Sequence, residues 1–309
     1  MPPAFRLLPV LVFAFASARL VAAETVIALW PEGVPGLHAD AQPDTDDGQG
    51  HYTHIHYPTL VVHAPPAGQA NGTAVIYAPG GGYTRVAPGV NGGIVTEWLN
   101  SLGITVYLLK YRHADYGHPA PLQDALRAVR LLRSRADELG IKHLGMLGGS
   151  AGGHLTASAG TLYDAPEGRT GAALDRVSGR PDFMVLIFPM ISMRDVRSDR
   201  RDPLLGEHPT EELKHHLSVD EQVTKDTPPT FLVHSAEDRG LVEGSVLFST
   251  AMRRAGAPIE LHLYTKGPHG DGMSPKLGPI SGWPRLCEAW LRFNGWLPAV
   301  RLADPPATP

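Results

Sequence analysis

The sequence predicts a three-layer α/β domain with a mostly parallel central sheet and helices on both faces. Two observations lead to this fold class. From about residue 57 onward, short apolar runs rich in β-branched residues alternate with longer runs of helical periodicity. Residues 148–152 place Ser150 among glycines, between an apolar run and a run of small residues, which is typical of a sharp strand-to-helix turn. Such alternation indicates parallel strands joined by right-handed helical crossovers.

Length and composition fit one large domain with a sizeable core. The chain has 309 residues, of which 43% are hydrophobic and 19% charged, and neither a repeat nor a linker divides it. The formal charge of −4 and the lack of a Lys/Arg run argue against nucleic acid as a partner. The single cysteine, Cys287, precludes an intrachain disulfide and is interpreted as a core residue.

The N-terminus has the pattern of an export signal. Arg6 precedes a short apolar stretch over residues 7–16, and residues 21–23 are small enough for cleavage. We therefore expect residues 1–23 to be a signal peptide, the mature protein to be periplasmic or secreted, and no membrane attachment after cleavage. An uncleaved anchor is the alternative, against which Arg19 interrupts the apolar run. The proline-rich tail, residues 303–309, is expected to be disordered.

The sequence predicts seven short strands, which would form the sheet, and one clear helix. The strands are short, apolar runs at residues 59–63, 73–77, 105–109, 144–147, 183–188, 230–234 and 259–264. The helix is expected over residues 121–139, where apolar residues recur at spacings of three and four. Pro121 suits its first position and Gly140 its end. Arg127, Arg130 and Arg133 are expected on a solvated face.

Residues 191–228 interrupt the alternation. This segment is charged and carries two short helix signals, the second opened by a capping-box pattern at Ser218 and Glu221. An insertion at this point of an α/β sheet would lie over the carboxyl ends of the strands, where ligands bind. The sequence therefore predicts a small cap over residues 191–228.

Ser150 is a candidate nucleophile, which needs a base, an orienting acid and an oxyanion hole. The base is expected to be His269, since the glycine-rich loop that holds it directly follows the last predicted strand. His154, one helical turn after Ser150, is interpreted as structural. The remaining histidine groups show no metal-ligand spacing and are expected to be solvated: His51, His54, His56 and His63 in the first strand region, and His215 and His216 in the cap.

Two carboxylates compete for the role of orienting acid. Glu237 and Asp238 both follow the strand at 230–234, in the loop that feeds the next helix. Asp124 is a weaker candidate because it precedes the nucleophile at the start of a helix. Asp271 is weaker because it lies only two residues from His269.

The oxyanion hole is expected in the loop Pro79-Gly80-Gly81-Gly82-Tyr83, which follows an early strand. Three successive glycines let backbone N–H groups converge on an anionic oxygen. Gly81 and Gly82, with the N–H of Ala151, are the expected donors. The loop lacks the spacing of a phosphate-binding motif.

The segments APGGGY, GGSAGGH, HSAED and KGPHG together resemble the α/β-hydrolase superfamily, and more narrowly the bacterial bifunctional feruloyl and acetyl-xylan esterases. The resemblance implies that residues 24–302 form an α/β-hydrolase catalytic domain and that Asp238, rather than Glu237, is the acid. It implies hydrolysis of a small-molecule or oligosaccharide ester through an acyl-enzyme, with no cofactor and no metal. The chain departs from these esterases at Asn91, where they often carry glutamate.

Other functions remain open on the same motifs. A peptidase of the prolyl-oligopeptidase type uses a similar domain, although no propeller precedes it here. A non-catalytic binding protein on this fold is a second alternative. Enzymes resembling dienelactone hydrolase carry cysteine at the position of Ser150.

Overall fold

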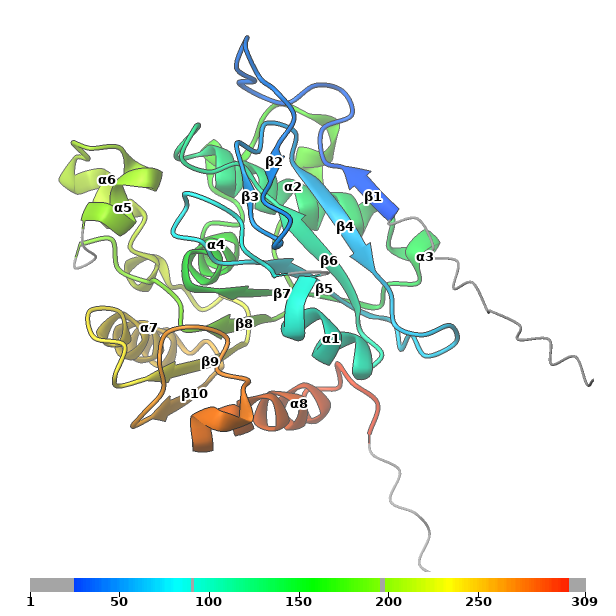
Figure 1. The fold of residues 1–309 in the computed structure, drawn as a ribbon, viewed down its shortest axis with the longest axis vertical. Helices are drawn as coiled ribbons and strands as arrows, with labels where there is room; N and C mark the ends of the chain where they lie inside the picture. The colour runs from blue at the N-terminus through cyan, green and yellow to red at the C-terminus, as the bar shows by residue number, and fades with distance from the viewer. Residues whose placement is uncertain (1–24, 90–91, 195–197, 300–309) are drawn as a thin grey trace, which may run out of the picture.

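A computed structural model of the chain describes residues 25–89, 92–194 and 198–299. The expected signal peptide and tail lie outside the described residues. An eight-stranded sheet forms the centre, and a two-stranded hairpin flanks it (Figure 1). In spatial order the central strands are β1 (Thr25–Ala28), β4 (Thr59–His63), β6 (Thr105–Lys110), β5 (Thr73–Ala78), β7 (His143–Gly149), β8 (Met184–Ile187), β9 (Thr230–Ser235) and β10 (Ile259–Tyr264). The hairpin pairs β2 (Thr45–Asp46) with β3 (Tyr52–Thr53).

The sheet is parallel from β6 to β10 and antiparallel at its other edge. β4 pairs antiparallel with both β1 and β6. β5 lies between β6 and β7, and all pairs from β6 to β10 run in the same direction. The carboxyl ends of β5, β7, β9 and β10 therefore meet at one edge of the sheet, where the loops after these strands converge.

Helices cover both faces, which confirms the predicted three-layer architecture. Side chains alternate along β5, where Ala74 and Ile76 face one layer and Val75 and Tyr77 the other. The first layer holds α2 (Ala120–Ser134), α4 (Ser150–Thr161) and α7 (Val242–Ala255). The second holds α1 (Gly93–Ser101) and α8 (Trp283–Phe293), where Cys287 is buried as predicted. The short helices are α3 (Ala136–Leu139), η2 (Pro166–Gly168), η3 (Ala173–Arg176) and η5 (Pro275–Gly282).

The helix expected over residues 121–139 breaks at Arg135 into α2 and α3. The prediction that its arginines are solvated is wrong for two of the three. Arg127 and Arg130 are buried because their guanidinium groups satisfy backbone carbonyls of packed loops, those of Leu29 and Gly168, each at 2.8 Å.

Segment 191–228 contains α5 (Ser198–Leu205), α6 (Glu211–His216) and η4 (Val219–Gln222). The predicted capping box is wrong. The Ser218 hydroxyl accepts from the N–H of Met193 and donates to the carbonyl of Lys214, so it makes no bond to its own helix. The side chain that caps a helix here is Thr210, which accepts from the N–H of Leu213 at the start of α6. In the described part of the chain, no helix is both long and apolar enough to cross a membrane.

Candidate active site

Ser150 lies where β7 ends and α4 begins, with a left-handed φ of 54°. Small residues allow this turn. A Cβ on Gly148 would lie 2.1 Å from the carbonyl oxygen of Gly152, and one on Gly152 would lie 2.0 Å from that of Ala78. Glycine is thus required at both positions, and the turn exposes the Ser150 hydroxyl above the sheet.

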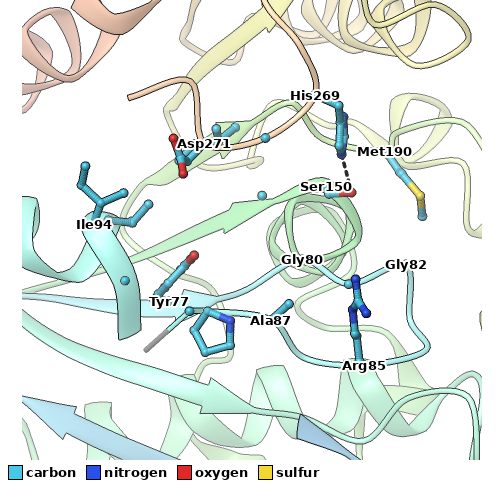
Figure 2. A pocket seen from close by; sticks show the side chains of 18 residues that line it. Tyr77, Gly80, Gly82, Arg85, Ala87, Ile94, Ser150, Met190, His269 and Asp271 are labelled. Atoms are coloured by element: carbon cyan, nitrogen blue, oxygen red, sulfur yellow. Dashed lines mark hydrogen bonds between the residues drawn. The ribbon is translucent and has the colours of Figure 1, made fainter. Parts of the chain in front are cut away.

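His269 and Asp238 meet at Ser150 from the loops after β10 and β9. Nε2 of His269 lies 2.9 Å from Oγ of Ser150, and Nδ1 lies 2.6 Å from Oδ2 of Asp238 (Figure 2 shows the first contact). If Nδ1 carries the proton, it donates to the carboxylate and Nε2 accepts from the serine hydroxyl. The structure therefore brings these three predicted residues together in one hydrogen-bonded chain.

A fourth residue, His234, contacts the Asp238 carboxylate. Its Nε2 lies 2.9 Å from the same Oδ2, and its Nδ1 lies 2.7 Å from Oγ of Ser245. Burial raises the pKa of Asp238, but the hydrogen bonds from His234 and His269 outweigh it and lower the pKa below the ordinary aspartate range. The carboxylate therefore stays charged beside His269. Sequence analysis missed His234, although a histidine at the end of a buried strand, four residues before the acid, is a usable signal.

The competing carboxylates have other contacts. Oε2 of Glu237 accepts from the N–H of Gly267 at 3.0 Å, so this exposed side chain holds the loop that carries His269. Asp124 is fully buried and binds Arg112 and the indole of Trp30. Oδ1 of Asp271 accepts from the N–H of Met273. Among the described residues, only Asp238 contacts His269 through a carboxylate.

The glycine loop packs directly on the serine turn. A Cβ on Gly80 would lie 3.0 Å from Cβ of Ser150. Gly81 and Gly82 have φ values of 142° and 64°, and their N–H groups donate to no described residue. The N–H of Ala151 lies in the first turn of α4, where helical partners are absent. All three expected donors are thus available near Ser150.

Two buried hydroxyls hold this loop. Tyr111 donates to the carbonyl of Pro79 at 2.8 Å. The hydroxyl of Tyr83 lies 2.8 Å from Nδ1 of His154, whose Nε2 lies 2.8 Å from the carbonyl of Leu217. Burial lowers the pKa of His154 to about 4, so its ring is neutral at pH 7. His154 is structural, as expected, and Tyr83 is a supporting residue that sequence analysis missed.

The histidines expected to be solvated differ in their surroundings. His51 pairs with Asp47, and His54 pairs with Asp115, both in exposed positions. His56 departs from the expectation because it is buried, with its Nδ1 2.7 Å from the Tyr116 hydroxyl. His216 is likewise not a free surface residue, since its Nε2 lies 2.5 Å from Oε1 of Glu167.

A pocket of about 720 Å³ opens at Ser150 (Figure 2). Arg85 and Asp271 place opposite charges on its wall, and Tyr77 presents its hydroxyl (Figure 2). Burial, with a smaller effect of the charge on Asp271, raises the pKa of Tyr77, so the phenol remains a neutral donor. Met190 directly precedes segment 191–228, and no described residue of that segment lines the pocket. Its role as a cap over the substrate stays a prediction.

Comparisons with known proteins identify relatives over most of the domain. The model of the BD-FAE family matches residues 60–252. An endo-1,4-beta-xylanase B from Butyrivibrio fibrisolvens is 33% identical over 205 residues, 63% of this chain and 32% of that protein. An acetylxylan esterase from Xylanibacter ruminicola is 29% identical over 222 residues, 65% of this chain and 42% of that protein. The chain thus spans less than half the length of both relatives.

One solved structure covers nearly the whole chain. The crystal structure of an acetyl ester-xyloside bifunctional hydrolase from Caldicellulosiruptor lactoaceticus superposes with a TM-score of 0.78 and 37% sequence identity. The match covers 91% of this chain and 100% of that one.

Proposed function

Since the chain belongs to the BD-FAE family of the α/β-hydrolase fold, we propose that it is a serine hydrolase of carboxylic esters. The observation that carries the proposal is the hydrogen-bonded chain from Ser150 through His269 to Asp238. An ester hydrolase of this kind needs a nucleophile, a base and an orienting acid in that contact order.

The reaction proceeds in two acyl transfers. His269 Nε2 takes the proton of the Ser150 hydroxyl as Oγ bonds to the ester carbonyl carbon. The tetrahedral intermediate collapses, the C–O bond to the alcohol breaks, and His269 returns the proton to the leaving oxygen. Water then attacks the acyl-enzyme by the same route and releases the acid. Asp238 fixes the ring orientation and stabilises the imidazolium.

The backbone N–H groups of Gly81, Gly82 and Ala151 stabilise the oxyanion in both steps. Support comes from the pocket that Gly81 and Gly82 line together with Ser150, from the place of Ala151 directly after Ser150, and from the hydrogen-bonding capacity that these N–H groups retain. Donors fixed before the reaction need no reorganisation as charge develops on the oxygen.

The substrate is an acetylated or feruloylated xylan or its oligosaccharides. The names of the relatives support this class, since they include an acetylxylan esterase, a xylanase and an acetyl ester-xyloside hydrolase. A pocket of about 720 Å³ can hold an acyl group together with part of a sugar. Tyr77 and Arg85 are placed to donate hydrogen bonds to sugar hydroxyls or to the ester. The proposal includes export to the periplasm or medium, where such polymers are found.

Hydrolysis rates on a matched panel test the proposal. The panel holds acetylated xylan, methyl ferulate, nitrophenyl acetate and a nitroanilide of the same acyl group. We expect ester cleavage that the Ser150→Ala variant loses and little cleavage of the amide. Preference for the amide would favour the peptidase alternative, and equal rates for Ser150→Ala and wild type would favour a binding protein.

A further inference from the structure

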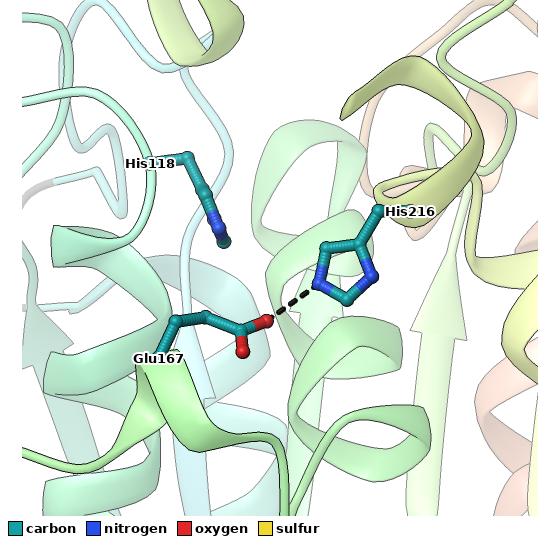
Figure 3. A group of neighbouring side chains, drawn as sticks. All are labelled: His118, Glu167 and His216. Atoms are coloured by element: carbon teal, nitrogen blue, oxygen red, sulfur yellow. Dashed lines mark hydrogen bonds and ion pairs between the residues drawn. The ribbon is translucent and has the colours of Figure 1, made fainter. Parts of the chain in front are cut away.

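Three side chains outside the active site converge on one point. His118 lies in the loop before α2, Glu167 in η2, and His216 at the end of α6 (Figure 3). One potential ligand atom from each lies within 4.8 Å of the other two. In the described part of the chain, no other three histidine, cysteine or acidic residues are arranged in this way.

The donor set is that of a transition-metal site. Two imidazoles and one carboxylate are a common ligand set for Zn²⁺, with a water in the fourth position. Zinc–ligand distances of about 2.0–2.2 Å set neighbouring ligand atoms about 3.4 Å apart. The separations between the three ligand atoms therefore need to change by no more than about 1.4 Å to fit an ion. Neither ring nitrogen of His118 bonds to a described residue, so one lone pair is available.

The cluster also has a structural context. The carbonyl of Leu204, at the end of α5, accepts from the backbone N–H of His118 at 2.8 Å. Glu167 and His216 already form a hydrogen bond of 2.5 Å between η2 and α6. Segment 191–228 thus docks on the body of the domain at the point where the three side chains meet. Leu217, next to His216, contacts His154 and through it the Tyr83 loop.

We propose that His118, Glu167 and His216, with a water as fourth ligand, form a Zn²⁺ site that fastens segment 191–228 to the body of the domain. The ion takes the place of the hydrogen bond between Glu167 and His216 and joins three segments that are distant in sequence. A metal that binds only the folded chain stabilises it by RT ln(1 + c/Kd), where c is the free zinc concentration, so the Tm should rise as the zinc concentration is raised above Kd. The inference is independent of the proposed ester hydrolysis.

Zinc titration of tag-free protein, stripped with a chelator, tests the site. We expect one Zn²⁺ per chain by equilibrium dialysis with elemental analysis, and a rise in Tm of about 5 °C at saturating zinc. Mg²⁺ and Ca²⁺ should leave the Tm unchanged because they prefer all-oxygen ligands. Co²⁺ should give the visible absorption of a site with nitrogen ligands. Wild-type protein that binds no zinc overturns the proposal, whatever the variants do.

Variants assign the ligands. Glu167→Gln and His216→Gln keep side-chain size and should lose both the bound zinc and the Tm rise. His215→Gln is the matched control, since His215 neighbours His216 but pairs with Glu221 outside the cluster. Ser150→Ala should bind zinc as wild type does, which separates this test from catalysis. If Glu167→Gln and His216→Gln still bind zinc, the assignment is contradicted. It is also contradicted if His215→Gln is the only variant that loses zinc.

Discussion

Nε2 of His234 lies 2.9 Å from Oδ2 of Asp238, the same oxygen that lies 2.6 Å from Nδ1 of His269. Two imidazole rings therefore form hydrogen bonds with the same carboxylate oxygen. His234 is completely buried, and its other nitrogen contacts the Ser245 hydroxyl. These contacts fix the Asp238 side chain from behind and lower its pKa, against the opposing effect of burial. We infer that His234 positions the acid without touching the substrate.

Replacing His234 should lower kcat more than it changes KM. His234→Leu removes a hydrogen bond to a charged group, and we expect kcat to fall by roughly 10- to 100-fold. His234→Gln keeps a donor and should recover part of that loss. The pH profile of kcat should also move, because the Asp238 charge is less stabilised. Equal rates and an unchanged profile for His234→Leu would show that the contact is only structural.

Replacing Asp238 and Glu237 one at a time by their amides tests which of the two orients His269. Asp238→Asn should lower kcat by about 10⁴, since the amide no longer selects the reactive tautomer of His269. Glu237→Gln should cost far less, because the Gln oxygen can still accept from the N–H of Gly267. Steady-state kinetics on nitrophenyl acetate measure both. A larger loss for Glu237→Gln would assign the acid to Glu237 instead.

The glycine loop offers a matched pair of substitutions. A Cβ on Gly81 would lie 2.1 Å from the Arg85 carbonyl oxygen, whereas one on Gly82 meets its nearest atom at 4.0 Å. Both variants keep their N–H groups and both place alanine at a positive φ, but only the Gly81→Ala side chain collides with backbone and must displace the loop. We expect a kcat loss of roughly 10²–10³ for Gly81→Ala and less than about tenfold for Gly82→Ala. Similar losses in both would mean that the loop geometry does not support the oxyanion.

Burial of His154 should make the fold sensitive to acid. Its pKa is about 4 in the folded chain, against about 6.5 when unfolded. Above pH 6.5 neither state takes up the proton. Between pH 6.5 and 4 only the unfolded state does, so the free energy of unfolding falls as the pH falls, by about 2 kcal/mol at pH 5. Urea denaturation at pH 7.5 and 5 measures this, and His154→Gln should show a pH-dependent loss smaller by that amount. An equal loss in both proteins would contradict the assignment.

Local patterns predicted seven of the eight central strands, together with Ser150 and His269, but missed β1 and the β2–β3 hairpin. Each of the seven expected strands forms, because each has an apolar or alternating run that the sequence displays directly. His269 was predictable because it follows a recognisable strand, whereas the pattern after the strand at 230–234 left Glu237 and Asp238 open and the family resemblance selected Asp238. Chain order then places both loops at the same edge of the sheet.

The failures share a physical cause. Arg127 looked solvated because its bond to the Leu29 carbonyl joins segments 98 residues apart. Ser218 matched a capping pattern, but a tertiary contact with Met193 takes its hydroxyl. His234, Tyr83 and His216 gain their partners only when distant loops pack together. Contacts between residues far apart in the chain produce no periodic pattern by which a single sequence could predict them.

Detection of an acyl-enzyme on Ser150 tests the central claim most directly. The protein is mixed with nitrophenyl acetate, quenched in acid within the first turnover, digested and analysed by mass spectrometry. The account predicts one acetyl group on the peptide that contains Ser150. It also predicts no hydrolysis by Ser150→Ala and near-normal hydrolysis by Ser158→Ala, a buried serine on the same helix. Acetylation at another residue, or hydrolysis that persists in Ser150→Ala, would contradict it.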